Sequence, residues 1–103
     1  MSKTRQNITA IIYNKRGDVL SIGKNDYIKT HPMQAHHAKL VGEAYKVYLH
    51  AEVAAIIRCK DLSKAHRILI TRTGNDGKTM LAAPCAICLS ALKAAGIFNI
   101  EHT

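Results

Sequence analysis

The stretch RILITRTGNDGKTMLAAPCAICLSALKAAGIFNI, residues 67–100, decides the fold of this chain. It opens with an apolar run at 67–71, which is typical of an interior strand, and continues into a turn-forming cluster of Gly, Asn and Asp. Pro84 fits the first turn of a helix, and Gly96 supplies the left-handed stop of that helix before a last short strand at 97–100. A strand, a helix and a strand in this order predict one right-handed crossover with its two strands parallel.

The residues before this stretch add two strands and two helices. Strand-forming residues fill 8–13 and 19–23, and the Asn, Gly and Asp between them predict a β-hairpin. A short helix is expected over 34–41, with Gly42 as its end signal. The segment from residue 48 or 49 to about 60 is a strongly apolar helix that must be mostly buried. The order of elements predicts an α/β fold with helices packed on a mixed sheet of four to five strands.

Length and composition favour a single domain over residues 1–103, since no segment has the composition of a linker. A domain of this size buries only a modest fraction of its surface on folding, so we expect a buried metal ion or a homo-oligomer interface to add stability. No apolar run approaches the roughly 20 residues of a membrane span, and the opening MSKTRQN lacks the apolar part of a secretory signal. We therefore expect a cytoplasmic protein without a membrane partner.

The chain is strongly basic. Fifteen Lys and Arg against seven Asp and Glu give a net charge of +8 and a pI near 9.7. Such a charge attracts polyanions and phosphorylated small molecules, although a basic surface that only confers solubility is the alternative.

Two short motifs, each expected at a helix start, offer ligands for a metal ion. Cys85 and Cys88 are three residues apart, so their sulfurs point the same way on a helical turn, and free N–H groups there stabilise thiolates. His50 adds one nitrogen. This donor set leaves the fourth tetrahedral position of zinc open, as catalytic zinc sites do. The third cysteine, Cys59, is expected to be a small core-facing side chain on a helix.

Glu52 follows His50 by two residues, close enough to move protons for a reaction at the metal. Each motif alone has an ordinary explanation, since Cys-x-x-Cys also occurs in redox motifs and half zinc fingers, and a first-turn Glu often only favours the helix dipole. Their joint occurrence at two helix starts, with a strand between them, favours a catalytic metal site. The remaining histidines are expected at the surface or in loops; they are His31, His36, His37, His66 and His102.

His50-Ala51-Glu52 and Pro84-Cys85-Ala86-Ile87-Cys88 together resemble the cytidine deaminase superfamily. Residues 50–57 and 88–97 are similar to the two zinc-binding helices of that family. The alanine-glycine-isoleucine end of the second helix is closest to the deoxycytidylate and tRNA-adenosine deaminase branch. Gly23-Lys24-Asn25 resembles a glycine-x-asparagine of that branch, whose side chain contacts sugar or base.

The resemblance implies the three-layer-type cytidine deaminase fold, a Zn²⁺ cofactor held by His50, Cys85 and Cys88, and a base lying between the two helix starts. It places the carbonyl group of the base near the backbone N–H of Ala51 and its amine near the backbone carbonyl of Ala83. Asn25 is a further candidate substrate contact, or an ordinary turn former. Members of the family usually continue beyond the fourth strand predicted here into a further strand and helix, so either a partner subunit replaces these or the pocket is more open.

Three functions follow as hypotheses. The first is hydrolytic deamination of a cytosine-containing nucleoside or nucleotide, such as dCMP, with Glu52 as the catalytic residue and Lys24, Lys29 and His31 as conceivable phosphate contacts. The second is deamination of cytosine or adenine in single-stranded DNA or RNA, which the charge favours. The five aromatic residues, several of them expected to be buried, count against this second hypothesis. The third is a zinc-stabilised module without catalysis, which the absence of a fourth ligand at suitable spacing disfavours.

Overall fold

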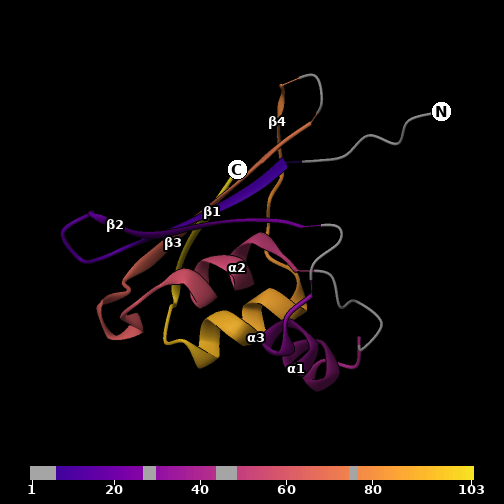
Figure 1. Ribbon diagram of the computed structural model, residues 1–103. Helices are drawn as coiled ribbons and strands as arrows, with labels where there is room; N and C mark the ends of the chain where they lie inside the picture. The colour runs from indigo at the N-terminus through magenta and orange to yellow at the C-terminus, as the bar shows by residue number, and fades with distance from the viewer. Residues whose placement is uncertain (1–6, 27–29, 44–48, 75–76) are drawn as a thin grey trace.

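The computed structural model of the protein describes residues 7–26, 30–43, 49–74 and 77–103. Over these residues, five strands form one mixed sheet and three α-helices lie on one side of it (Figure 1). This arrangement confirms the predicted α/β fold with helices packed on a mixed sheet. None of the described helices has the length and apolar character needed to cross a membrane.

The predicted hairpin is confirmed. Strand β1 (Asn7–Tyr13) pairs antiparallel with β2 (Val19–Lys24), and along its other edge it pairs antiparallel with β3 (Arg67–Thr73). Residues of β1 alternate between the two faces of the sheet, so Ala10 and Ile12 are fully buried while their neighbours are partly exposed. The same alternation in β3 turns two isoleucines, Ile68 and Ile70, into the core.

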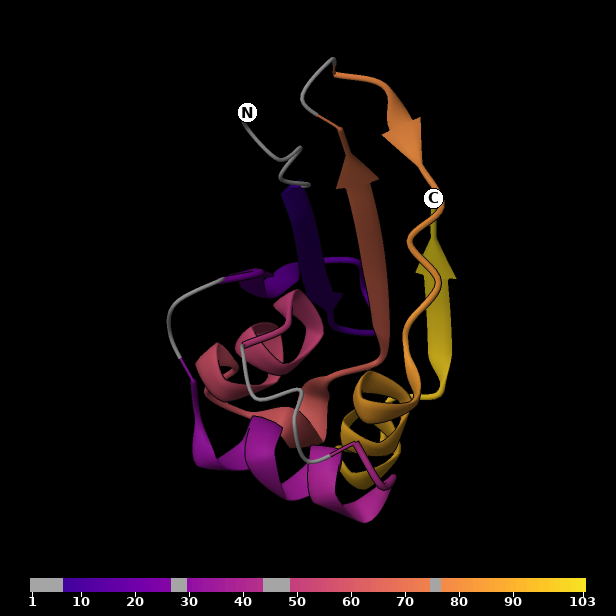
Figure 2. The ribbon, with the colours of Figure 1, turned by 90° about the vertical axis from the view of Figure 1, so that its right-hand side faces the viewer.

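Two short strands share the remaining edge of β3 (Figure 2). Strand β5 (Asn99–His102) runs parallel to the first part of β3, as predicted, and β4 (Thr79–Met80) runs antiparallel to its last part. The prediction of a strand at 97–100 was wrong by two residues, because Ile97 turns into the core before the pairing begins. Strand β4 was not predicted, because two residues are too few to show a periodic pattern.

Thr103 joins the strands that meet on this edge. Its N–H donates to the carbonyl of Ile70 at 3.0 Å, and its carbonyl accepts from the N–H of Ala82 at 2.8 Å. Its hydroxyl accepts from the N–H of Arg72 at 3.2 Å and donates to the carbonyl of Met80 at 2.7 Å. Thr103 therefore fills the gap along β3 between the end of β4 and the end of β5.

The first helix, α1 (Pro32–Leu40), begins two residues before the predicted start. The imidazole of His31 accepts a hydrogen bond from the N–H of Met33 at 3.0 Å, and Pro32 occupies the first turn, where a missing N–H costs nothing. Gly42, with φ of 77°, lies beyond the helix end as expected.

The two motif-bearing helices are shorter than predicted. Helix α2 (Ala51–Arg58) begins after His50, and Tyr48 lies outside the described residues. Helix α3 (Ala86–Ala94) begins two residues after Pro84, so the expectation that this proline forms part of the first turn was wrong. The stop at Gly96 is confirmed by its φ of 79°.

Helix α2 packs directly on β1 and β2, α3 packs on α2, and α1 packs on α3. The approach of β2 to α2 is close at Gly23, where a Cβ atom would lie 2.8 Å from the carbonyl carbon of Ala54 and still closer to backbone atoms of Ala51 and Ala55. Only a glycine leaves room for this packing. The core is aliphatic, and its largest fully buried hydrophobic side chains are Ile12, Val53, Ile68, Ile70, Ile87, Leu92 and Ile97.

Candidate metal centre

The structure brings His50, Cys85 and Cys88 together at the start of two helices. His50 is the N-cap of α2, Cys85 is the N-cap of α3, and Cys88 lies in the first turn of α3. His50 Nδ1 lies 3.2 Å from Cys88 Sγ and 3.4 Å from Cys85 Sγ, and the three ligand atoms all lie within 4.8 Å of one another. Residues separated by 35 positions in the sequence thus form one group.

This group fits a zinc ion. With Zn–N near 2.1 Å and Zn–S near 2.3 Å, tetrahedral geometry places the ligand nitrogen about 3.6 Å from each sulfur. The separations of 3.2 Å and 3.4 Å differ from that value by a few tenths of an ångström. One imidazole and two cysteine sulfurs are a donor set that zinc accepts, and Zn²⁺ is the cofactor that these residues suit.

The two cysteine thiols are strongly coupled. A hydrogen bond from Cys88 lowers the pKa of Cys85 to about 3, and the imidazole of His50 favours the same thiolate. The same hydrogen bond, together with burial, raises the pKa of Cys88. Zinc binds cysteine as the thiolate, so metal binding at this pair releases protons.

Cys59 stays outside this group. It is the C-cap of α2, at the opposite end from His50, and it is buried in the hydrophobic core. The prediction that it packs in the core is confirmed, although it lies just past the helix end.

Glu52 lies in the first turn of α2 and is only 6% exposed. Burial raises the pKa of its carboxyl group, which interacts with the thiol of Cys88 and lies in the electrostatic field of His50 and Cys85. A carboxyl group whose pKa is raised by burial holds a proton more readily than an exposed one. The arrangement places a buried carboxyl group beside the three candidate ligands.

Gln34 is a supporting residue that sequence reasoning missed. Its side chain is fully buried in α1, and its Oε1 accepts a hydrogen bond from the N–H of His50 at 3.2 Å. The contact fixes the backbone of a candidate ligand at the point where α2 begins. No local sequence pattern predicts this hydrogen bond, because the bond depends on how α1 packs against the start of α2.

His37 corrects the expectation that the other histidines lie at the surface or in loops. It is buried in α1, and its Nδ1 lies 2.8 Å from the hydroxyl of Ser90 in α3. Its neighbour His36 is exposed, as expected for adjacent residues that do not share a helix face. His66 and His102 are exposed, while His31 is half-buried as the cap of α1.

The candidate substrate contacts lie around the helix starts. Asn25 Oδ1 accepts from the N–H of Ile8 at 3.1 Å, which holds the side chain at the end of β2. The next residue, Asp26, donates its N–H to the carbonyl of Leu49 at 2.9 Å, so this segment lies beside His50. Ala51 is the first residue of α2 and is fully buried, and Ala83 is exposed two residues before Cys85.

The three candidate phosphate contacts have different positions. Lys24 is exposed at the end of β2, and His31 caps α1 with its imidazole nitrogen. Lys29 lies outside the described residues.

Comparison with known proteins identifies the family. No curated protein and no solved structure matches the chain. The sequence profile of the cytidine and deoxycytidylate deaminase zinc-binding region matches residues 1–101, and this span includes both helix starts that carry the candidate ligands. A match over nearly the whole chain, joined to a His/Cys/Cys group with dimensions that suit zinc, shows that the protein belongs to the cytidine and deoxycytidylate deaminase zinc-binding family.

Proposed function

We propose that the protein is a zinc-dependent hydrolytic deaminase that converts a cytosine-containing nucleoside or nucleotide, dCMP among them, to the uracil product and ammonia. The observation that carries this proposal is the buried carboxyl group of Glu52 against the group formed by His50, Cys85 and Cys88. A zinc site with a purely structural role has no use for a buried acid at this place.

In this proposal His50, Cys85 and Cys88 hold the metal. When bound, zinc supplies the Lewis acidity that makes water a competent nucleophile at neutral pH. A carboxylate oxygen of Glu52 takes one proton from water as the water oxygen bonds to the ring carbon that carries the amine, and delivers this proton to the ring nitrogen. Glu52 then takes the second proton from the same oxygen, which becomes the new carbonyl oxygen, and delivers it to the departing amine. The carbon–nitrogen bond to the amine breaks, and ammonia leaves.

The substrate contacts are backbone groups and one amide. The N–H of Ala51, at the first position of α2, has no acceptor within the helix and would donate to the carbonyl group of the base. The carbonyl of Ala83 would accept from the amine, and Asn25 would contact the sugar. The hydrogen bond between Asp26 and Leu49 supports this role, because it holds the Asn25 segment beside His50.

The net charge of +8 favours a second candidate, deamination of a base in single-stranded DNA or RNA. Phe98 bears on this candidate, because its ring is 72% exposed and a base could stack on it. However, Phe98 follows the end of α3, whereas Cys85 precedes its start, and nine helical residues separate them by about 13 Å. The ring is therefore not next to the metal centre, which leaves the free substrate as the better candidate.

The decisive experiment replaces Glu52 with Gln in zinc-loaded protein. Ammonia release from cytidine, deoxycytidine and their monophosphates is measured together with zinc content. We expect turnover to fall by about 10²–10⁴-fold, the range that a general acid–base catalyst contributes, while zinc content stays unchanged. A labelled single-stranded oligonucleotide in the same assay tests the second candidate.

Glu101→Gln is the matched control, since this glutamate is exposed on β5 and pairs with Arg67 at 2.8 Å. It should keep parental turnover. A Glu52→Gln protein with full turnover would refute the proposed role of the carboxyl group, and a parent that releases no ammonia from any substrate would leave only a zinc-stabilised module.

A further inference from the structure

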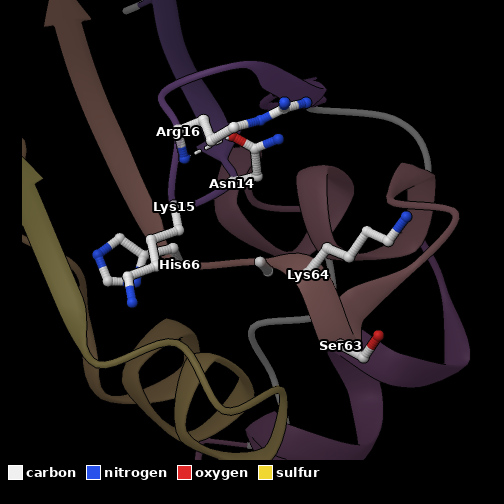
Figure 3. A pocket seen from close by; sticks show the side chains of 7 residues that line it. Asn14, Lys15, Arg16, Ser63, Lys64 and His66 are labelled. Carbon is white, nitrogen blue, oxygen red and sulfur yellow. Dashed lines mark hydrogen bonds between the residues drawn. The ribbon is translucent and has the colours of Figure 1, made fainter.

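A basic hollow lies beyond the end of α2, away from the metal centre. Figure 3 shows it from close by. It has a volume of about 460 Å³ and lies between the β1–β2 turn and the segment that precedes β3. Helix α2 separates the two places, with His50 before its first residue and the hollow beyond its last, a length of about 12 Å. The hollow is therefore not part of the site described above.

Two lysines, one arginine and one imidazole surround this hollow. In Figure 3, Lys15 and His66 occupy one side, Lys64 lies on the other, and Arg16 forms the upper rim. None of the residues that line it is acidic. Lys15 makes no ion pair with any residue in the described part of the chain, so its charge is available to a ligand.

The turn that carries Lys15 and Arg16 is held rigidly by its first residue. Asn14 Oδ1 accepts from the N–H groups of Arg16 at 3.0 Å and Asp18 at 2.9 Å, and the N–H of Asn14 donates to the carbonyl of Asp18 at 2.9 Å. Gly17, with φ of 93°, completes the turn. The backbone that carries the two cations is therefore held in one conformation, which lowers the entropic cost of binding.

The opposite wall is fixed in a similar way. Asp61 Oδ1 accepts from the N–H of Ser63 at 3.1 Å, and the N–H of Lys64 donates to the carbonyl of Asp61 at 3.2 Å. The N–H of His66 donates to the carbonyl of Tyr13 at 2.8 Å, which ties this wall to β1. Both walls thus keep their separation without a ligand.

We propose that this hollow binds closely spaced phosphate groups, from a free polyphosphate or from the backbone of a nucleic acid strand. Its volume exceeds what a single phosphate group fills, and its cations lie on several sides of it. Two neighbouring carboxylates limit the affinity: Asp18 pairs with Arg16 at 3.3 Å and Asp61 lies near Lys64, but the exposed Arg16 can exchange its partner for a phosphate. Apart from the imidazole of His66 the lining holds no aromatic ring, so phosphates rather than bases are recognised.

The test compares the parent with a Lys15→Gln/Lys64→Gln double variant, using the zinc-loaded full chain. The probes are inorganic tripolyphosphate, followed by calorimetry, and a fluorescently labelled thymidine homopolymer, followed by anisotropy, each at several salt concentrations. We expect the double variant to bind at least about 10-fold more weakly at low salt. Its slope of log affinity against log salt should fall by about 1.4, because two single-strand phosphate contacts are lost.

Lys39→Gln is the matched control, since this lysine is exposed in the last turn of α1. Weaker binding of tripolyphosphate alone would identify a free polyphosphate as the source, and weaker binding of the homopolymer alone would identify a nucleic acid. Parental affinity of the double variant for both probes would overturn the proposal, as would an equal loss in Lys39→Gln. Backbone amide shifts of Lys15, Gly17 and His66 on adding tripolyphosphate give a second readout, and neither measurement requires deamination.

Discussion

His37 shows how a single buried residue makes stability depend on pH. Burial lowers the pKa of its imidazole, and the neighbouring His36 lowers it further. Below the unperturbed value near 6.5 the unfolded chain binds a proton that the folded protein does not. The free energy of unfolding therefore falls as the pH drops below about 6.5, and it keeps falling until the lowered pKa is passed.

The variant His37→Gln should remove this part of the pH dependence while keeping a polar group near Ser90. Unfolding in urea, measured between about pH 5 and pH 8, should show a slope that is smaller than the parental one by up to about 1.4 kcal/mol per pH unit. His66→Gln, the same change at an exposed histidine, is the control. Identical slopes in parent and His37→Gln would show that the folded protein binds a proton at His37 as readily as the unfolded chain.

At the scale of elements, the contact of β2 with α2 depends on Gly23. A methyl group there would overlap the backbone of Ala51, Ala54 and Ala55, and the helix cannot withdraw without pulling His50 from the two cysteines. Gly23→Ala should lower stability by about 1–3 kcal/mol, the cost of overpacking, and should weaken zinc binding as well.

Gly17→Ala is the comparison for Gly23→Ala, because Gly17 has φ of 93° but open space around its Cβ position. It should cost about 1–2 kcal/mol through backbone strain alone and leave zinc affinity unchanged. Thermal unfolding and a competition assay with a zinc indicator check both variants. Equal zinc affinity in Gly23→Ala and the parent would show that α2 and the metal centre do not move together.

Strong local patterns allowed most elements to be predicted from the sequence. Alternation and β-branching identified β1, β2 and β3, and two cysteines with a preceding histidine identified the metal centre before any contact was known. The sequence did not reveal the two-residue strand β4, the buried amide of Gln34 or the burial of His37. Each of these features depends on how α1, α3 or the edge of β3 packs against segments that are distant in the sequence. Such contacts produce no periodic pattern of apolar residues from which they could be predicted.

At the scale of the whole molecule, the metal centre links helices that are far apart in the sequence. Zinc that binds only the folded protein stabilises it by about 2.7 kcal/mol at a free concentration 100-fold above its dissociation constant. For a chain of 103 residues this corresponds to a change in Tm of roughly 10–20 °C. Chelation should therefore lower the Tm of the zinc-loaded protein by an amount in this range.

Cysteine variants test whether this stabilisation comes from the proposed ligands. Cys85→Ser should respond little to the chelator, whereas Cys59→Ser, which alters the buried thiol at the other end of α2, should respond like the parent. Differential scanning fluorimetry with and without chelator measures both. A full response in Cys85→Ser would place the metal elsewhere.

The hydrogen bonds of Thr103 have a practical consequence for anyone who attaches a reporter or an affinity tag. The N–H of Ala82 donates to the carbonyl of Thr103, and Ala82 lies only three residues before Cys85. A group attached at Thr103 that breaks this hydrogen bond is therefore expected to displace the sulfur of Cys85 in the metal centre. Fusion partners are better placed ahead of β1, whose first residue, Asn7, contacts neither cysteine-bearing segment in the hydrogen-bonded sheet.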